Sequence, residues 1–265
     1  MKTLRYYARL YLLIVSQYIK ARMQYRADFI ISSIGMVFIS LATILTFRVL
    51  FNSIPTLVGW SFDEIVFIYG FFMLAVTPLQ LFFDHIWQLR YHVQEGTFIK
   101  YYFRPLNMMF YYMSEMVDLK GIVQVFLGFG ALIYASARLG LVWTPLRVLL
   151  LFVMLFSSSM VTISILTMAA CTCFWTTNSF PVMALALKIR DFAQYPMTVF
   201  EGFFRFIFTY VIPIGFVAFY PAQLFLRPED VSPLVYISPL VGIGFFALAY
   251  VIWTKGVNSY TGTGS

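Results

Sequence analysis

The chain has 265 residues, of which 61% are hydrophobic, 20% aromatic and only 11% charged. About a quarter of the residues in soluble domains are charged, so this composition excludes an ordinary soluble domain and indicates a polytopic membrane protein. The formal net charge of +7 does not indicate a nucleic-acid partner, because the basic residues flank apolar runs as the positive-inside pattern predicts. We expect a single all-α membrane domain over residues 1–265.

Residues 1–26 predict an amphipathic helix that lies on the membrane surface. Apolar and aromatic side chains recur at helical spacing from Leu4 to Tyr18, whereas Arg5, Arg9 and Lys20 fall largely on other faces. Such a helix places its aromatic rings in the interface and its cations toward the lipid headgroups. More basic residues follow it, and a stronger apolar run comes next, so the stretch is not read as a cleaved signal peptide.

Four apolar runs follow, and each is close to or above the roughly 20 residues that a membrane span needs. They cover residues 29–51, 65–83, 117–134 and 148–171. The connection after the first run has no Lys or Arg and is expected outside the cell. The two cysteines, Cys171 and Cys173, suit neither a disulfide framework nor a zinc site, so we interpret them as packing residues.

The region after Phe174 allows two interpretations. In the first, residues 180–192 begin a fifth span, and the run from Pro196 to Pro221 enters the outer leaflet and returns. In the second, the former stretch lies on the cytoplasmic surface and residues 203–225 form the fifth span.

The prolines favour the first interpretation. Pro196, Pro213 and Pro221 divide the run into pieces shorter than a crossing needs. We therefore expect a re-entrant element over residues 195–221, before a last span at Leu234–Trp253. A polar tail is expected to begin at Lys255. Six spans would place both termini in the cytoplasm.

Ionisable residues at or near membrane depth are costly unless they are paired or wetted, which makes them candidates for function. Interfacial anchoring with mutual ion pairing explains the same residues equally well. With two of the prolines, the candidates for the pathway or its gate are Lys188, Arg190, Asp191, Glu201, Arg205, Pro213 and Pro221.

The inner loop holds the most polar stretch in the middle of the chain, VQEGTFIKYYFRPLN at residues 93–107. The chain has no G-x-x-x-x-G-K-[ST] motif, so any use of ATP must come from a partner. His85 and His92 lack the spacing of a metal-binding H-E-x-x-H motif. No metal and no cofactor of its own are expected.

Four features in order along the chain carry a resemblance to a known family. They are the amphipathic N-terminus, the stretch VQEGTFIKYYFRPLN, a YP followed by FTYVIPIGFVAFYPAQLF, and the ending YTGTGS. Together they resemble the membrane subunits of type-2 ABC transporters (the ABC-2 type), in a bacterial six-span permease group with a separate ATPase. The resemblance covers essentially the whole chain.

The resemblance implies a permease of the bacterial plasma (inner) membrane that most often exports its substrate. It would assemble with a second permease subunit, identical or related, and with two cytoplasmic ABC ATPase subunits. The chain itself would not be an enzyme, since ATP would be bound and hydrolysed in the partner.

The resemblance also implies that residues 93–107 are a coupling segment, a short cytoplasmic helix that docks into a groove of the ATPase. The aromatic residues would supply anchors, Arg104 a contact at the rim, and Gly96 and Pro105 the ends of the helix. The expected coupling residues are Glu95, Gly96, Phe98, Tyr101, Tyr102, Phe103, Arg104 and Pro105.

Two other classes of function are alternatives. A channel or ion-coupled secondary carrier would be expected to show intramembrane acids or duplicated halves, which the sequence lacks. A membrane-embedded enzyme would need a clustered catalytic set, and only scattered acids occur. The sequence does not indicate a substrate.

Overall fold

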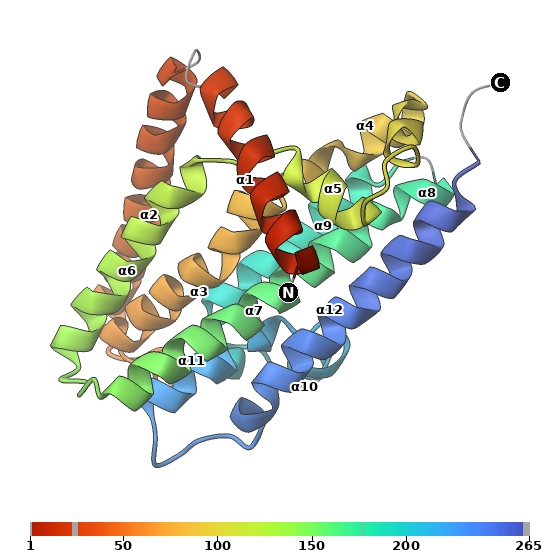
Figure 1. Cartoon of the computed structure of the whole chain (residues 1–265). Helices are drawn as coiled ribbons and strands as arrows, with labels where there is room; N and C mark the ends of the chain where they lie inside the picture. Colours follow the sequence, from red (N-terminus) through yellow and green to blue (C-terminus); the bar gives the residue numbers. More distant parts are fainter. Residues whose placement is uncertain (1, 23–25, 177, 262–265) are drawn as a thin grey trace.

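The computed structural model describes residues 2–22, 26–176 and 178–261, which form an all-α bundle (Figure 1). Five helices in these ranges are long and apolar enough to cross a membrane. They are α2 (Arg26–Ser53), α3 (Phe62–Phe82), α6 (Lys120–Arg138), α7 (Pro145–Cys171) and α12 (Leu234–Ser259). The prediction of an all-α, multi-pass membrane protein is thereby confirmed.

Helix α3 forms the centre of the bundle. Its side chains are apolar on every face, which is typical of a helix surrounded by protein, and 78% of its apolar window is buried. It packs mainly against α6 and α7, while α12 lies along α7 (Figure 1). Small residues allow the close approach: a Cβ atom at Gly70 would lie 2.9 Å from the carbonyl oxygen of Gly128.

Helix α2 stands apart from this core. Only 6% of its apolar window is buried inside the protein, although it is among the most apolar helices of the chain. Its contacts are mainly with α6 and α3, and large apolar side chains such as Phe38 and Ile39 point outward.

Helix α1 (Lys2–Arg22) lies against the short helix α5 (Met108–Ser114). The ring of Tyr7 meets that of Phe110 edge to face, with ring centroids 4.9 Å apart. The expected surface helix is therefore present as a helix, whereas its position at a membrane interface stays a prediction. Residues 1 and 23–25 of the expected stretch lie outside the described residues.

The bundle has two ends, which we name after their helices. The α5 end comprises residues 84–119, the short helix α8 (Cys173–Thr176) and the last turns of α12 (Figure 1). The α11 end comprises the turns at residues 54–61, 139–144 and 227–233.

Residues 84–119 fold into short helical pieces. They are η2 (Asp84–Gln88), α4 (Leu89–Gln94), η3 (Thr97–Tyr101) and α5.

The chain between α8 and α12 is broken into short pieces. These are α9 (Phe180–Asp191), η4 (Phe192–Gln194), η5 (Met197–Val199), α10 (Gly202–Phe206), the π-helix η6 (Ile207–Val211), η7 (Ile214–Phe216) and α11 (Phe219–Leu226). Residues 203–225 thus do not form one straight helix. Pro213 lies two residues beyond the last residue of the π-helix and lacks the N–H that a continuing helix would need.

One boundary differs from expectation. Lys255 was predicted to open a polar tail, but α12 continues to Ser259 and includes it. Hydropathy marks the apolar part of a helix, whereas the backbone hydrogen bonds continue into polar sequence.

Candidate functional site

The predicted coupling segment, residues 93–107, is a short helix held between two turns. Gly96 has a φ of 71°, a left-handed conformation that glycine adopts without strain, and it separates α4 from η3. After η3 the chain turns through Pro105 to Asn107, whose side-chain oxygen accepts a hydrogen bond from the Phe110 N–H and caps α5. The local sequence therefore fixes both ends of the segment.

The aromatic residues of this segment face two directions. Phe98 and Tyr101 are 0% and 1% exposed, whereas Tyr102 and Phe103 are 40% and 77% exposed. A 3₁₀ helix has three residues per turn, so positions 98 and 101 share one face of η3. All four were expected to anchor a partner; in the structure Phe98 and Tyr101 pack inside the chain, whereas Tyr102 and Phe103 remain accessible.

Phe98 fastens the segment to distant parts of the sequence. Its ring centroid lies 5.2 Å from that of Phe174 and 5.4 Å from that of Tyr260. The hydroxyl of Tyr102 donates a hydrogen bond to the carbonyl oxygen of Val257 near the end of α12. The coupling segment is thus attached to α8 and to the last turns of α12.

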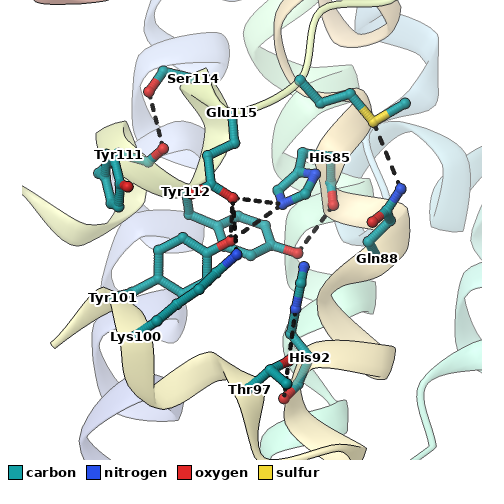
Figure 2. Close-up of polar contacts among 11 residues, drawn as sticks. His85, Gln88, His92, Thr97, Lys100, Tyr101, Tyr111, Tyr112, Ser114 and Glu115 are labelled. Atoms are coloured by element: carbon teal, nitrogen blue, oxygen red, sulfur yellow. Dashed lines mark hydrogen bonds and ion pairs between the residues drawn. The ribbon is translucent and has the colours of Figure 1, made fainter. Parts of the chain in front are cut away.

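A polar network fastens the other side of the segment (Figure 2). The carboxylate of Glu115 accepts hydrogen bonds from the Tyr101 hydroxyl at 2.6 Å and from the Lys100 ammonium at 3.2 Å. The Nε2 atom of His85 lies 3.6 Å from the same carboxylate, and the Tyr112 hydroxyl donates to the His85 carbonyl oxygen. We name Glu115, Lys100, Tyr101, His85 and Tyr112 the Glu115 network.

Burial sets the protonation state of this network. It lowers the pKa of His85 to about 4, and the opposing attraction of Glu115 only partly offsets it. Burial and the hydrogen bond to Glu115 raise the pKa of Tyr101 above its ordinary value. His85 is therefore neutral near pH 7, so its contact with Glu115 is not an ion pair. The cation that pairs with Glu115 is the ammonium of Lys100.

The sequence did not predict the Glu115 network. Glu115 lies outside residues 93–107, and its partners come from within that segment (Lys100 and Tyr101) and from before it (His85). Among the described residues, no group of three or more His, Cys, Asp or Glu side chains is placed to hold a metal ion.

The remaining coupling candidates lie on the surface. Residues 102–105 are all exposed, and Glu95 is exposed where α4 ends. We name Tyr102, Phe103, Arg104 and Pro105 the exposed coupling face. It presents an aromatic ring and a guanidinium on one side of a segment whose other side is buried.

The pathway candidates do not form one cluster. Arg190 and Asp191 pair with each other at 2.7 Å where α9 ends. Lys188, Glu201 and Arg205 are exposed, and none has an ion-pair partner among the described residues. The contacts that these five residues make do not give them a shared role.

We name the short helical pieces between α8 and α12 the broken segment. Pro213 and Pro221 are both buried, and they occupy different positions in it. Pro213 lies in the break between η6 and η7, whereas Pro221 lies in the first turn of α11, where proline is tolerated.

A cluster at the α11 end was also missed. The Arg227 guanidinium pairs with Glu64 through two hydrogen bonds of 2.9 and 3.2 Å and lies 3.7 Å from the Trp60 ring centroid. Glu64 also closes the capping box of α3 with Ser61, and the Trp60 indole donates to Thr198. We name these five residues the Arg227 cluster.

The fold defines a multi-pass membrane protein that exposes a short, firmly attached helical loop at one end. The chain belongs to the ABC-2 family transporter proteins, whose family model matches residues 37–264. The resemblance found in the sequence is thus confirmed, and the chain is a permease of a family that lacks a nucleotide-binding domain of its own. No curated protein and no solved structure matches the chain.

Proposed function

We propose that the chain is the membrane subunit of an ABC exporter in the bacterial inner membrane. It would form the translocation pathway with a second, identical or related permease subunit and would be driven by separate cytoplasmic ATPases. Membership of the ABC-2 family supports an ATPase partner in general terms. The segment at residues 93–107 is proposed as the ATPase contact.

The exposed coupling face carries this proposal. A contact that transmits force needs an anchor that a partner can bury and a support that does not yield. Phe103 is 77% exposed, whereas Phe98 on the short helix η3 just before it is fully buried, and the Glu115 network holds the segment from the side. Aromatic residues and arginine are enriched among residues that dominate binding energy at interfaces.

The distribution of basic residues supports a cytoplasmic α5 end. This end carries Arg90, Lys100, Arg104 and Lys255, and Lys120 begins α6 beside it. At the α11 end, Arg227 and Arg138 are paired with the neighbouring acids Glu64 and Asp63. Because cytoplasmic loops carry the excess of Lys and Arg, we place the α5 end and both termini in the cytoplasm.

The course of the chain from α9 onward supports six crossings. Phe180 at the start of α9 lies against Arg90 of the α5 end, with the guanidinium carbon 5.2 Å from the ring centroid. Tyr195 contacts Phe47 late in α2, and Thr198 bonds Trp60 at the α11 end. Residues 180–198 would therefore be the fifth crossing.

The residues that follow support the proposed re-entrant element. The hydroxyls of Thr209 and Tyr220, one on each side of Pro213, lie 2.8 Å apart. The two limbs of the broken segment therefore lie together. We propose that this segment closes the external end of the pathway, with the Arg227 cluster holding it to the turn before α3.

The direct test is reconstitution with an ABC ATPase encoded beside this gene. We expect the two proteins to copurify and the ATPase to hydrolyse ATP faster in the complex than alone. A permease with Phe103 and Arg104 both changed to alanine should express normally and lose both effects. Copurification and ATP hydrolysis at wild-type levels with this variant would overturn the proposed coupling site.

A further inference from the structure

The broken segment borders an open polar cavity whose groups suit a ligand. It has a volume of about 340 Å³ and lies between α10, the π-helix η6, α11 and the start of α12. Its polar lining comes from Arg205, Thr209, Tyr210, Tyr220, Gln223 and Ser232. Ligand sites are often this size or larger, and π-helical turns occur frequently at functional sites.

Two groups in this cavity lack a protein partner. The Oε1 atom of Gln223 is buried and accepts no hydrogen bond. Arg205 has no ion-pair partner among the described residues, and the acids nearest to it in the chain, such as Glu201, are not part of the lining. A buried unpaired acceptor is costly, so a hydrogen-bond donor from a ligand or water would stabilise it.

The hydroxyl groups of Thr209 and Tyr220 add a further hydrogen-bond donor to the cavity. Thr209 and Tyr220 share one hydrogen bond, in which one hydroxyl donates and the other accepts. The accepting hydroxyl keeps its own proton for a third group. The cavity thus presents a cation, a free hydroxyl proton and a carboxamide, which together complement a phosphate ester that also carries free hydroxyl groups.

The residues around the cavity indicate its level in the membrane. Phe203, Phe204, Phe206 and Tyr210 are 57 to 71% exposed around Arg205. Aromatic residues beside a cation are typical of the level of the lipid headgroups. Phosphate groups with hydroxyls reach this level as lipid headgroups or as water-soluble esters.

We propose that this cavity binds a hydroxyl-bearing phosphate ester, with Arg205 on the phosphate and Gln223 on a hydroxyl. Its placement in the outer leaflet depends on the proposed topology, whereas the cavity and its chemistry do not. Thr209 and Tyr220 would direct the remaining hydroxyl proton to a phosphate oxygen.

Binding is tested with the purified full chain in detergent, without an ATPase. Native mass spectrometry would count retained phosphatidylglycerol, phosphatidic acid and phosphatidylcholine, and calorimetry would measure glycerol 1-phosphate as the soluble source. We expect phosphatidylglycerol to be retained about tenfold more than phosphatidylcholine, because both lipids carry the phosphate that Arg205 would contact but only phosphatidylglycerol has headgroup hydroxyls for Gln223. Preference for glycerol 1-phosphate over the lipid would identify the soluble source of the same chemistry.

The variants separate the two contacts. Arg205→Gln should lower phosphatidylglycerol retention about tenfold, while Arg205→Lys should keep most of it. Gln223→Leu should weaken phosphatidylglycerol but leave phosphatidic acid, which has no headgroup hydroxyl, unchanged. Arg147→Gln, at a half-buried arginine that does not line the cavity, is the matched control and should have no effect.

Three results would overturn the proposal. They are absence of binding by both the lipid and glycerol 1-phosphate, wild-type retention by Arg205→Gln, and an equal loss in Arg147→Gln. Each would mean that the cavity holds only water or that lipids bind unspecifically. Because the assay contains no ATPase, these failures are distinct from a failure of the proposed coupling.

Discussion

Phe103→Ala should separate coupling from folding. The Phe103 side chain is 77% exposed, so its removal leaves no cavity, and the free energy of unfolding should change by no more than about 0.5 kcal/mol. If the ATPase buries this ring at the centre of the contact, truncation should cost about 2 kcal/mol of binding free energy. That corresponds to a dissociation constant about thirtyfold weaker.

The matched control lies in the same coupling segment, on the short helix η3. Phe98 is 0% exposed and packs against Phe174 and Tyr260, so Phe98→Ala should cost about 3–5 kcal/mol of folding free energy. Lys100→Ala removes only an exposed ammonium paired with Glu115 and should weaken ATPase binding less than Phe103→Ala does.

The assay titrates the ATPase against each variant in lipid nanodiscs, and thermal unfolding is followed separately. Two results would refute the reasoning. The first is Phe103→Ala binding within about twofold of wild type, since a central anchor cannot be that dispensable. The second is Phe98→Ala with unchanged unfolding, because a fully buried ring cannot be removed without a loss of packing.

Three further predictions concern stability and topology. The His85 pKa is about 4 in the folded chain and 6.5 ordinarily, so the unfolded chain binds this proton more tightly. The contribution of His85 should be complete above about pH 6.5 and fall by about 3 kcal/mol toward pH 4, and thermal unfolding of His85→Gln should lack this part of the pH dependence. Gly70→Ala should lower the unfolding temperature because the new Cβ meets the backbone of α6, whereas Gly130→Ala, which meets nothing within 4 Å, should not. Ser61→Cys should react with a membrane-impermeant thiol reagent in intact cells, since the native cysteines are buried; absence of labelling would contradict an external α11 end.

The sequence predicted the long helices well because apolar length alone decides them. The run expected at residues 65–83 is the helix Phe62–Phe82, and that expected at 148–171 is Pro145–Cys171. The broken segment could also be anticipated, since proline removes a backbone donor wherever it stands.

The site was only partly predictable because its geometry depends on contacts between distant residues. Whether Phe98 or Phe103 faces outward depends on packing with Phe174 and Tyr260, which no local pattern reveals. Glu64 and Arg227 pair across most of the chain, and either one alone resembles an ordinary interfacial charge. Hydropathy reads neighbours in sequence, so it finds the spans but not these pairs.

The isolation of α2 makes its tolerance to substitution informative. A helix buried among neighbours on one side accepts polar residues only at positions that recur every three or four residues. If α2 is surrounded by hydrocarbon alone, it should reject charged residues equally at Phe38, Ile39 and Leu41, which point in different directions. If α2 packs against a second permease subunit, the positions that reject substitution should instead form a stripe along one side of the helix. A saturation scan of this one helix therefore identifies what surrounds it in the membrane.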